Sequence, residues 1–186
     1  MAVAAVSVGA AHQADGDSDM NFDLKRIWSH LCTGNFTTRK HFPTDVLTEI
    51  TSTITSSEAK HTGQIQFAVE PSLGLPELLK GVTARQRAID VFSQLRVWDT
   101  EENCGVLIYL LEAEHQIEIV ADRGITKLST PEFWETVCVQ MERHLKTGHF
   151  KEGVIEGIQL ITEEIARNFP PKGASKNELD NAPIIL

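Results

Sequence analysis

The fold is decided by residues 98–124, which have the sequence WDTEENCGVLIYLLEAEHQIEIVADRG. The continuous apolar run at 106–111 predicts a central strand buried on both faces, and the alternating run at 116–121 predicts its edge partner. Only a short polar turn joins the two runs, so the strands should be antiparallel. The second strand then returns to the place where the first began. We therefore expect Asp122 to lie beside the acidic loop at 99–103.

A second strand precedes this hairpin. Residues 64–69 alternate polar and apolar side chains, which predicts a strand with its apolar side chains facing inward. Thr83 is predicted to cap a helix that leads towards the strand at 106–111. Strand, helix and strand form a βαβ unit, whose two strands should be parallel with a right-handed crossover.

Apolar residues at helical spacing predict further helices at both ends of the chain. The expected helices cover residues 22–31, 43–61, 130–148 and 150–169, with one helical turn at 76–80. We predict a single domain at residues 21–170, with an N-terminal helical extension at 21–60. A disordered leader is expected at residues 1–20, and a flexible tail at 171–186.

Composition argues against several classes of function. The 186 residues carry a formal net charge of −9, whereas a nucleic-acid-binding surface needs a clustered basic face. The negative charge leaves metal cations and basic partner proteins open. No apolar run approaches the roughly 20 residues of a membrane-spanning helix, so no membrane span is expected. The three cysteines, Cys32, Cys104 and Cys138, show no regular spacing, which fits a reducing environment and predicts a cytoplasmic protein.

Side chains that carry oxygen recur in the acidic loop at positions i, i+2 and i+4. They are Asp99, Glu101 and Asn103, and hard cations such as calcium need several ligands of this kind. EF-hand loops begin with the same spacing, but the twelfth position of such a loop would be Leu110, inside the predicted strand. A partial divalent-cation site completed by Asp122 is one interpretation, and a solvated acidic turn is the other.

The same end of the sheet is predicted to attract anions. A helix that begins near Thr130 follows the second strand after a few residues, so its N-terminus should face the acidic loop. Helix N-termini attract phosphate and carboxylate, and we expect Arg123 to lie nearby. A cation site beside such a helix end is the arrangement that metal-assisted phosphate chemistry needs.

A basic motif, Thr38-Arg39-Lys40-His41, stands earlier in the chain. Its functional interpretation is a contact with an anion or a lipid headgroup, and the alternative is a solvated loop. It precedes Pro43, where the next helix is expected to begin.

The hairpin stretch resembles the TPM domain family. The likeness lies in Asn103-Cys104-Gly105-Val-Leu-Ile-Tyr, followed by an Ile-Glu-Ile-Val strand and a turn that ends in glycine. With the neighbouring helices it covers roughly residues 42–169. The family includes a thylakoid lumen phosphatase-like protein of photosystem II repair and an auxiliary protein of acetylcholine receptors. Residues 177–183 are similar to the tail of bacterial members that carry this domain alone.

The resemblance implies a Rossmann-like α/β fold, a three-layer α/β/α sandwich around a small mixed sheet, in agreement with the pattern above. For some members it also implies divalent-cation binding, often calcium, and a proposed acid phosphatase activity. The family's Asn/Asp-Asn-Gly turn maps onto residues 103–105, where Cys104 replaces a carboxamide and so removes one hard oxygen ligand. The glycine turn after the second strand maps onto residues 122–124, where Asp122 adds an acid.

Three functional hypotheses follow. The first is a cytoplasmic binding or regulatory module that holds a divalent cation, with calcium as the first candidate, through the four oxygen side chains named above. The second is a metal-assisted acid phosphatase, a phosphomonoesterase in which Arg123 and the helix start at Thr130 hold phosphate and an activated water attacks. The third is a protein-interaction module whose apolar tail at residues 184–186 docks on a partner protein.

Overall fold

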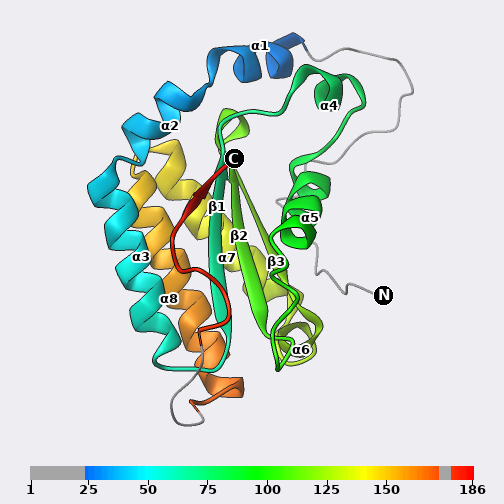
Figure 1. Cartoon of the computed structure of the whole chain (residues 1–186). Helices are drawn as coiled ribbons and strands as arrows, with labels where there is room; N and C mark the ends of the chain where they lie inside the picture. Colours follow the sequence, from blue (N-terminus) through cyan, green and yellow to red (C-terminus); the bar gives the residue numbers. More distant parts are fainter. Residues whose placement is uncertain (1–23, 172–176) are drawn as a thin grey trace.

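The strand predicted from residues 106–111 is present as β2 (Gly105–Leu111), and all of its residues are buried. The computed structural model describes residues 24–171 and 177–186, so the leader predicted at 1–20 lies outside the described residues. Within these ranges the strands form one sheet in the order β3-β2-β1-β4 (Figure 1).

Both predicted strand directions are confirmed. β1 (Gln64–Glu70) runs parallel to β2 in continuous register, and β3 (Gln116–Ala121) runs antiparallel to β2, with Val106 opposite Ala121. The start of β2 and the end of β3 therefore lie together at one end of the sheet, the lower end in Figure 1.

Helices cover both faces of the sheet and its upper end. The helices of the described ranges are α1 (Leu24–Cys32), α2 (Asn35–His41), α3 (Thr44–Glu58), α4 (Leu75–Leu79), α5 (Ala84–Gln94), α6 (Arg123–Thr126), α7 (Pro131–Lys146) and α8 (Phe150–Asn168), with a 3₁₀ turn, η1 (Glu112–Glu114), between β2 and β3. Thr83 caps α5 as predicted. Its hydroxyl accepts a hydrogen bond from the backbone N–H of Gln86 at 3.2 Å, and the Gln86 side chain accepts one from Thr83 at 3.0 Å. None of the helices in the described part of the chain has the length and apolar character needed to cross a bilayer.

The core consists of two apolar clusters, one on each face of the sheet. Phe67 and Ile108 belong to the cluster that packs against α3, α7 and α8. Leu107 and Tyr109 point the other way, into the cluster that packs against α5. The result is the expected three-layer α/β/α sandwich around a mixed sheet (Figure 1).

The C-terminal residues depart from the expected flexible tail at 171–186. β4 (Ile184–Ile185) pairs in parallel with β1, and the backbone N–H of Leu186 donates to the carbonyl of Val69 at 3.0 Å. The apolar end that was expected to dock on a partner protein therefore docks on the sheet of its own chain (Figure 1).

Two glutamines of β1 explain this docking. Gln64 and Gln66 occupy the polar positions of the alternating strand, yet they are only 1% and 3% exposed. The Gln64 side-chain oxygen accepts backbone hydrogen bonds from Glu178 at 2.9 Å and Leu179 at 3.1 Å. The Gln66 amide donates to the carbonyl of Ala182 at 3.0 Å. The alternating pattern alone suggests that these side chains face solvent. Instead they form hydrogen bonds with backbone groups of the C-terminal segment.

The basic motif that begins at Thr38 lies in a helix, α2, and not in a loop. The Thr38 hydroxyl donates to one carboxylate oxygen of the buried Glu112, and Nδ1 of His41 lies 2.5 Å from the other. Arg39 and Lys40 remain exposed. Half of the motif therefore anchors α2 to η1, and its two permanent cations face outward.

Candidate functional site

Backbone hydrogen bonds join the acidic loop to the turn after β3, at the lower end of the sheet in Figure 1. The N–H of Asp122 donates to the carbonyl of Gly105 at 2.9 Å, and the N–H of Gly124 donates to the carbonyl of Asn103 at 2.9 Å. The structure therefore places Asp122 beside the acidic loop, as the direction of the strands predicts.

Two glycines permit close approaches of the backbone at this end of the sheet. A Cβ atom at Gly105 would lie 1.9 Å from the carbonyl oxygen of Val97, and one at Gly124 would lie 2.5 Å from the carbonyl oxygen of Asn103. Both obstacles are backbone atoms, which cannot rotate away. A side chain at Gly124 would push the turn away from the loop, and one at Gly105 would push the start of β2 away from Val97.

The loop has a fixed internal conformation. Asn103 adopts a left-handed φ of 54°, which asparagine tolerates better than most residues. Thr100 closes the loop from within: its hydroxyl accepts the N–H of Cys104 at 3.0 Å, and its carbonyl accepts the N–H of Asn103 at 3.1 Å. Cys104 is 1% exposed, its thiol donates to the carbonyl of Thr62 at 3.5 Å, and burial raises its pKa to about 11. The residue that replaces the family's carboxamide is therefore a packed thiol that faces the core.

The guanidinium group of Arg123 covers the side chain of Asn103. Its Nε and Nη2 atoms donate to the Asn103 Oδ1 atom at 2.9 Å and 2.6 Å. This contact was not predicted, because the sequence pattern placed Arg123 near an anion. The amide oxygen expected to bind a metal is thus held by a cationic side chain of the same chain.

Asp122 is the buried acid of the site, at 6% exposed. Its Oδ1 atom accepts the backbone N–H of Arg123 at 2.6 Å and caps α6, whereas Oδ2 is buried without a hydrogen-bond partner among the described residues. Burial raises the pKa of Asp122, and the hydrogen bond from Arg123 opposes that rise. A buried carboxylate oxygen without a partner is costly, so this atom favours a bound cation or a proton.

The two acids at the start of the loop have different surroundings. Asp99 forms an exposed ion pair with Arg96, with 2.5 Å between Oδ2 and Nη2. Glu101 is exposed, and its backbone N–H donates to a carboxylate oxygen of Glu178 at 2.9 Å. Among the described residues, no hydrogen bond or ion pair joins either acid to Asn103. The predicted cation ligands therefore divide into an inner pair and an outer pair.

The outer pair borders a depression that the sequence does not predict. Asp99, Thr100 and Glu101 line it together with Asn177 and Glu178 of the C-terminal segment, and its volume is about 480 Å³. Three carboxylates thus border one hollow. No sequence signal could reveal it, because it depends on the docking of a segment expected to be a free tail.

The oxygen side chains are of the type that a hard cation binds, but they do not form a complete coordination site. Within residues 24–171 and 177–186, no group of three or more His, Cys, Asp or Glu side chains is placed to hold a metal ion. The inner pair nevertheless offers an unpartnered carboxylate oxygen on Asp122 and an amide oxygen on Asn103, the ligand types that calcium prefers. A cation could bind there only after Arg123 leaves Asn103.

The predicted anion-binding residues also have partners within the chain. The exposed Thr130 caps α7, and its hydroxyl accepts the N–H of Phe133 at 3.4 Å. Arg123 is exposed but bound to Asn103. No hydrogen bond joins Arg123 to Thr130 in the described part of the chain.

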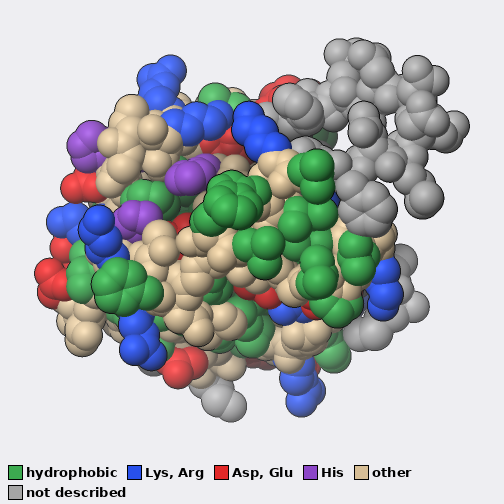
Figure 2. Space-filling view, turned by 90° about the horizontal axis from the view of Figure 1, so that it is seen from above, with side chains coloured by type: hydrophobic (Ala, Val, Ile, Leu, Met, Phe, Trp, Pro, Cys, Tyr) green, Lys and Arg blue, Asp and Glu red, His purple; other side chains and the backbone are tan. Residues whose placement is uncertain are grey.

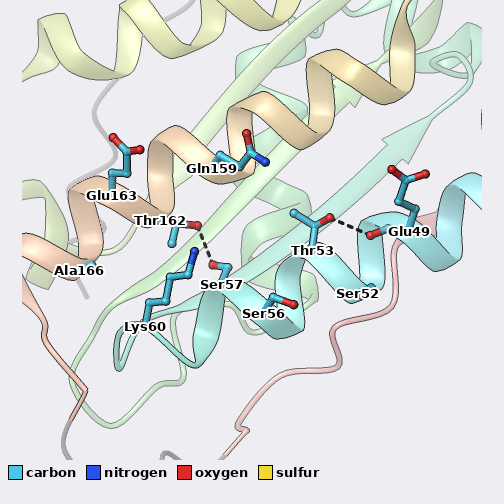
Figure 3. Close-up of a pocket in the computed structure, with 10 residues that line it drawn as sticks. All are labelled: Glu49, Ser52, Thr53, Ser56, Ser57, Lys60, Gln159, Thr162, Glu163 and Ala166. Carbon is cyan, nitrogen blue, oxygen red and sulfur yellow. Dashed lines mark hydrogen bonds between the residues drawn. The ribbon is translucent and has the colours of Figure 1, made fainter.

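A second hollow, away from this site, runs between α3 and α8 (Figure 3). Its volume is about 500 Å³, and its lining residues are Glu49, Ser52, Thr53, Ser56, Ser57, Lys60, Gln159, Thr162, Glu163 and Ala166. At its base the Thr162 hydroxyl lies 2.8 Å from the Ser57 hydroxyl, which lies 3.0 Å from Nε2 of His61. The other ring nitrogen of His61 lies 3.0 Å from the carbonyl of Gly63, and burial lowers the His61 pKa to about 4. These side chains satisfy one another and connect α3 to α8, so the hollow is framed by structural contacts.

Comparison with known proteins assigns the chain to a family. A sequence model of the TPM domain matches residues 39–164, more than half of the chain. The chain belongs to the TPM domain family. The matched range includes β1, β2, β3 and the whole inner site, whereas α1 and the C-terminal strand β4 lie outside it.

This TPM domain protein also matches solved structures. Seven chains match, and one of them is the NMR structure of the BA42 protein from the psychrophilic bacterium Bizionia argentinensis, with 27% sequence identity and a TM-score of 0.68. The match covers 76% of this chain and 93% of that one. No curated protein sequence matches the chain.

Proposed function

We propose that this TPM domain protein is a divalent-cation-binding module with a regulatory role, and that calcium is its first candidate ligand. The observation that carries the proposal is the buried Oδ2 atom of Asp122, which has no hydrogen-bond partner among the described residues. Asp122 is held against the acidic loop by backbone hydrogen bonds, so its carboxylate adds to a region already rich in oxygen. Asn103 supplies the next oxygen, and Asp99 and Glu101 add carboxylates at the neighbouring hollow.

Arg123 provides the regulatory element. Its guanidinium group donates two hydrogen bonds to the Asn103 amide oxygen. It thereby places a positive charge beside the oxygens that would bind the cation. A bound divalent cation would supply that positive charge and take the oxygens as ligands. Release of Arg123 would then expose a cationic side chain beside the loop, which is a change of surface that a partner can recognise.

Calcium titration followed by amide chemical shifts tests the proposal. Amides of residues 99–105 and 121–124 should shift at millimolar calcium, and Asp122→Asn should abolish the shifts. Arg123→Gln should tighten binding about tenfold, equivalent to about 1.4 kcal/mol, because the competing guanidinium is gone. Lys127→Gln is the matched control, since it removes an equal charge from the exposed C-cap of α6. If no amide in the two ranges shifts in the wild-type protein, the proposal is wrong.

A metal-assisted acid phosphatase is the second candidate. The upward shift of the Asp122 pKa by burial favours it, because a general acid needs a carboxyl whose pKa lies above the ordinary value. Arg123 and Thr130 would hold the phosphate, and an activated water would attack it. Hydrolysis of p-nitrophenyl phosphate tests this candidate: activity must exceed background, and Asp99→Ala and Asp122→Ala must each remove it.

We propose a cytoplasmic location on the evidence of the thiols. Cys104 and Cys138 are buried and Cys32 is exposed, and all three are free. Unpaired cysteines are typical of reducing compartments. Fractionation of cells that express the full chain, with a compartment marker for each fraction, checks this location.

A further inference from the structure

Large apolar side chains are exposed at the end of the molecule opposite the acidic loop, over α1 and α4 (Figure 2). Leu24, Trp28 and Leu31 follow one side of α1 at positions i, i+4 and i+7, and they are 75%, 69% and 69% exposed. Leu75 and Leu79 of α4 are 52% and 54% exposed. We call these five residues the α1–α4 face.

The orientation of α1 is the reverse of that of an ordinary surface helix, which buries its apolar stripe. Here the polar side packs against the protein. Arg26 and His30 both contact one carboxylate oxygen of Glu114, at 2.7 Å and 2.8 Å. The hydroxyl of Ser29 donates to the carbonyl of Ala113 at 2.5 Å. Because polar contacts fix α1 in place, the fold itself turns the apolar stripe outward.

Basic residues are exposed on α4 and on α2, the helix that follows α1 in the chain. Arg39 and Lys40 of α2 and Lys80, at the end of α4, are exposed, whereas the acid of α4, Glu77, is half-buried. Figure 2 shows Lys and Arg side chains along the edge of the hydrophobic group. Phe36, also on α2, is 86% exposed and adds an aromatic side chain three and four positions before Arg39 and Lys40. A local positive border on a chain of net charge −9 indicates a negatively charged partner.

We propose that the α1–α4 face docks on a membrane surface that carries anionic lipid headgroups. Leu24, Trp28 and Leu31 enter the boundary between headgroups and acyl chains, as in interfacial amphipathic helices. Arg39, Lys40 and Lys80 contact lipid phosphates, and each basic residue near an anionic surface contributes about 1 kcal/mol. The proposal is independent of the cation site, which lies at the other end of the sheet.

Charge decides between a membrane and a second copy of the chain. Two copies joined through this face would bring their basic borders together, and like charges at close range repel. An anionic bilayer attracts the same border and accepts the apolar side chains. Tryptophan is enriched at the headgroup level of membranes, and Trp28 occupies the middle of the apolar stripe.

Co-sedimentation of the full chain with lipid vesicles tests the proposal. The protein should bind vesicles of phosphatidylcholine mixed with phosphatidylglycerol, bind phosphatidylcholine vesicles at least about tenfold more weakly, and dissociate as salt is raised. Trp28→Ser with Leu31→Ser should weaken binding by more than about tenfold. The matched control is Leu128→Ser with Val139→Ser, which removes two exposed apolar side chains elsewhere and should leave binding unchanged.

A charge-reversal pair separates electrostatic from apolar contributions. Arg39→Glu with Lys40→Glu should weaken binding to the anionic vesicles by more than about tenfold, whereas Lys127→Glu with Arg143→Glu, both exposed on other elements, should not. Circular dichroism of each variant confirms that it folds. The proposal is overturned if the wild-type chain does not bind anionic vesicles, or if both charge-reversal pairs weaken binding equally. It is also overturned if sedimentation equilibrium shows a dimer that Trp28→Ser dissociates while vesicle binding persists.

Discussion

At Gly124 the chain has no room for a side chain, because the carbonyl oxygens of Glu102 and Asn103 approach the position that a Cβ atom would occupy. The neighbouring residues depend on this approach. Asn103 holds a left-handed φ of 54° and accepts two hydrogen bonds from Arg123, and Asp122 turns its carboxylate to the start of α6. The absence of a Cβ atom at Gly124 therefore allows the polar groups of Asn103, Asp122 and Arg123 to take these positions.

Replacement of this glycine is the prediction at the residue scale. Gly124→Ala should lower the free energy of unfolding by about 2–3 kcal/mol, since the added methyl group overpacks against backbone atoms. Chemical denaturation in urea measures the change. Gly34→Ala is the matched control, because a Cβ atom there meets nothing within 4 Å, and we expect it to change stability by less than about 1 kcal/mol. Equal stabilities of the two variants would contradict the steric account.

At the scale of elements, the polar positions of the alternating strand β1 have a role that the sequence pattern does not reveal. Its apolar side chains face inward as predicted, and they lie in the cluster covered by α3 and α8, but its glutamines form hydrogen bonds with Glu178, Leu179 and Ala182 of the C-terminal segment. β4 lies outside the matched TPM domain and pairs with β1 where that strand would otherwise be a sheet edge. An exposed edge strand invites pairing with other chains, so the tail protects the sheet.

The side chain of Gln64 should control how firmly this tail is docked. Gln64→Leu keeps the size of the side chain but leaves the N–H groups of Glu178 and Leu179 without an acceptor. Amide hydrogen exchange at Glu178, Leu179 and Leu186 should become about tenfold faster, which corresponds to about 1–2 kcal/mol of lost protection. Gln159→Leu, on the exposed side of α8, is the control. Unchanged exchange at Leu186 would show that β4 docks without the help of Gln64.

The elements that could be predicted from sequence are those with strong local signals. The apolar run at 106–111 is short and continuous, which favours a buried strand, and the hydroxyl of Thr83 followed by Gln86 marks the start of α5. From these two features follow the sheet directions and the meeting of Asp122 with the acidic loop. The contact between Arg123 and Asn103 could not be predicted, because it depends on the left-handed conformation of one residue. β4 could not be predicted either, since two residues carry no periodicity.

At the scale of the whole molecule, two buried groups give stability an opposed dependence on pH. Burial raises the pKa of Glu58 from 4.5 to about 7, and burial lowers the pKa of His61 from 6.5 to about 4. Glu58 keeps its proton in the native state, so its contribution to stability is complete below pH 4.5 and is lost as pH rises through 7. His61 stays neutral in the native state, so its contribution is present above pH 6.5 and is lost as pH falls through 4. Between pH 4.5 and 6.5 the two slopes oppose each other.

Glu58→Gln should remove the contribution of Glu58 and leave the pH dependence of stability that His61 causes. Relative to the wild-type protein, the variant should gain stability as pH rises from 4.5 to 7, up to about 3 kcal/mol for a shift of roughly two and a half pKa units. Its amide oxygen can still accept the N–H of Ile65, which Glu58 accepts at 3.2 Å. Urea unfolding at a series of pH values from 4.5 to 8 measures the difference. Glu163→Gln, an exposed acid on α8, should show no such trend, and a constant difference for Glu58→Gln would rule out the raised pKa.

The length of β2 has a consequence for the proposed cation site in the acidic loop. The strand has seven residues and so spans about 23 Å, with the loop at its start and η1, which contacts α1, at its end. At physiological ionic strength the diffuse layer of counterions over a charged bilayer decays over about 8 Å. When the protein is docked through the α1–α4 face, the strand acts as a spacer of nearly three decay lengths. The proposed cation site would then be exposed to the ion concentration of the bulk solution and not to the excess of cations at the lipid surface.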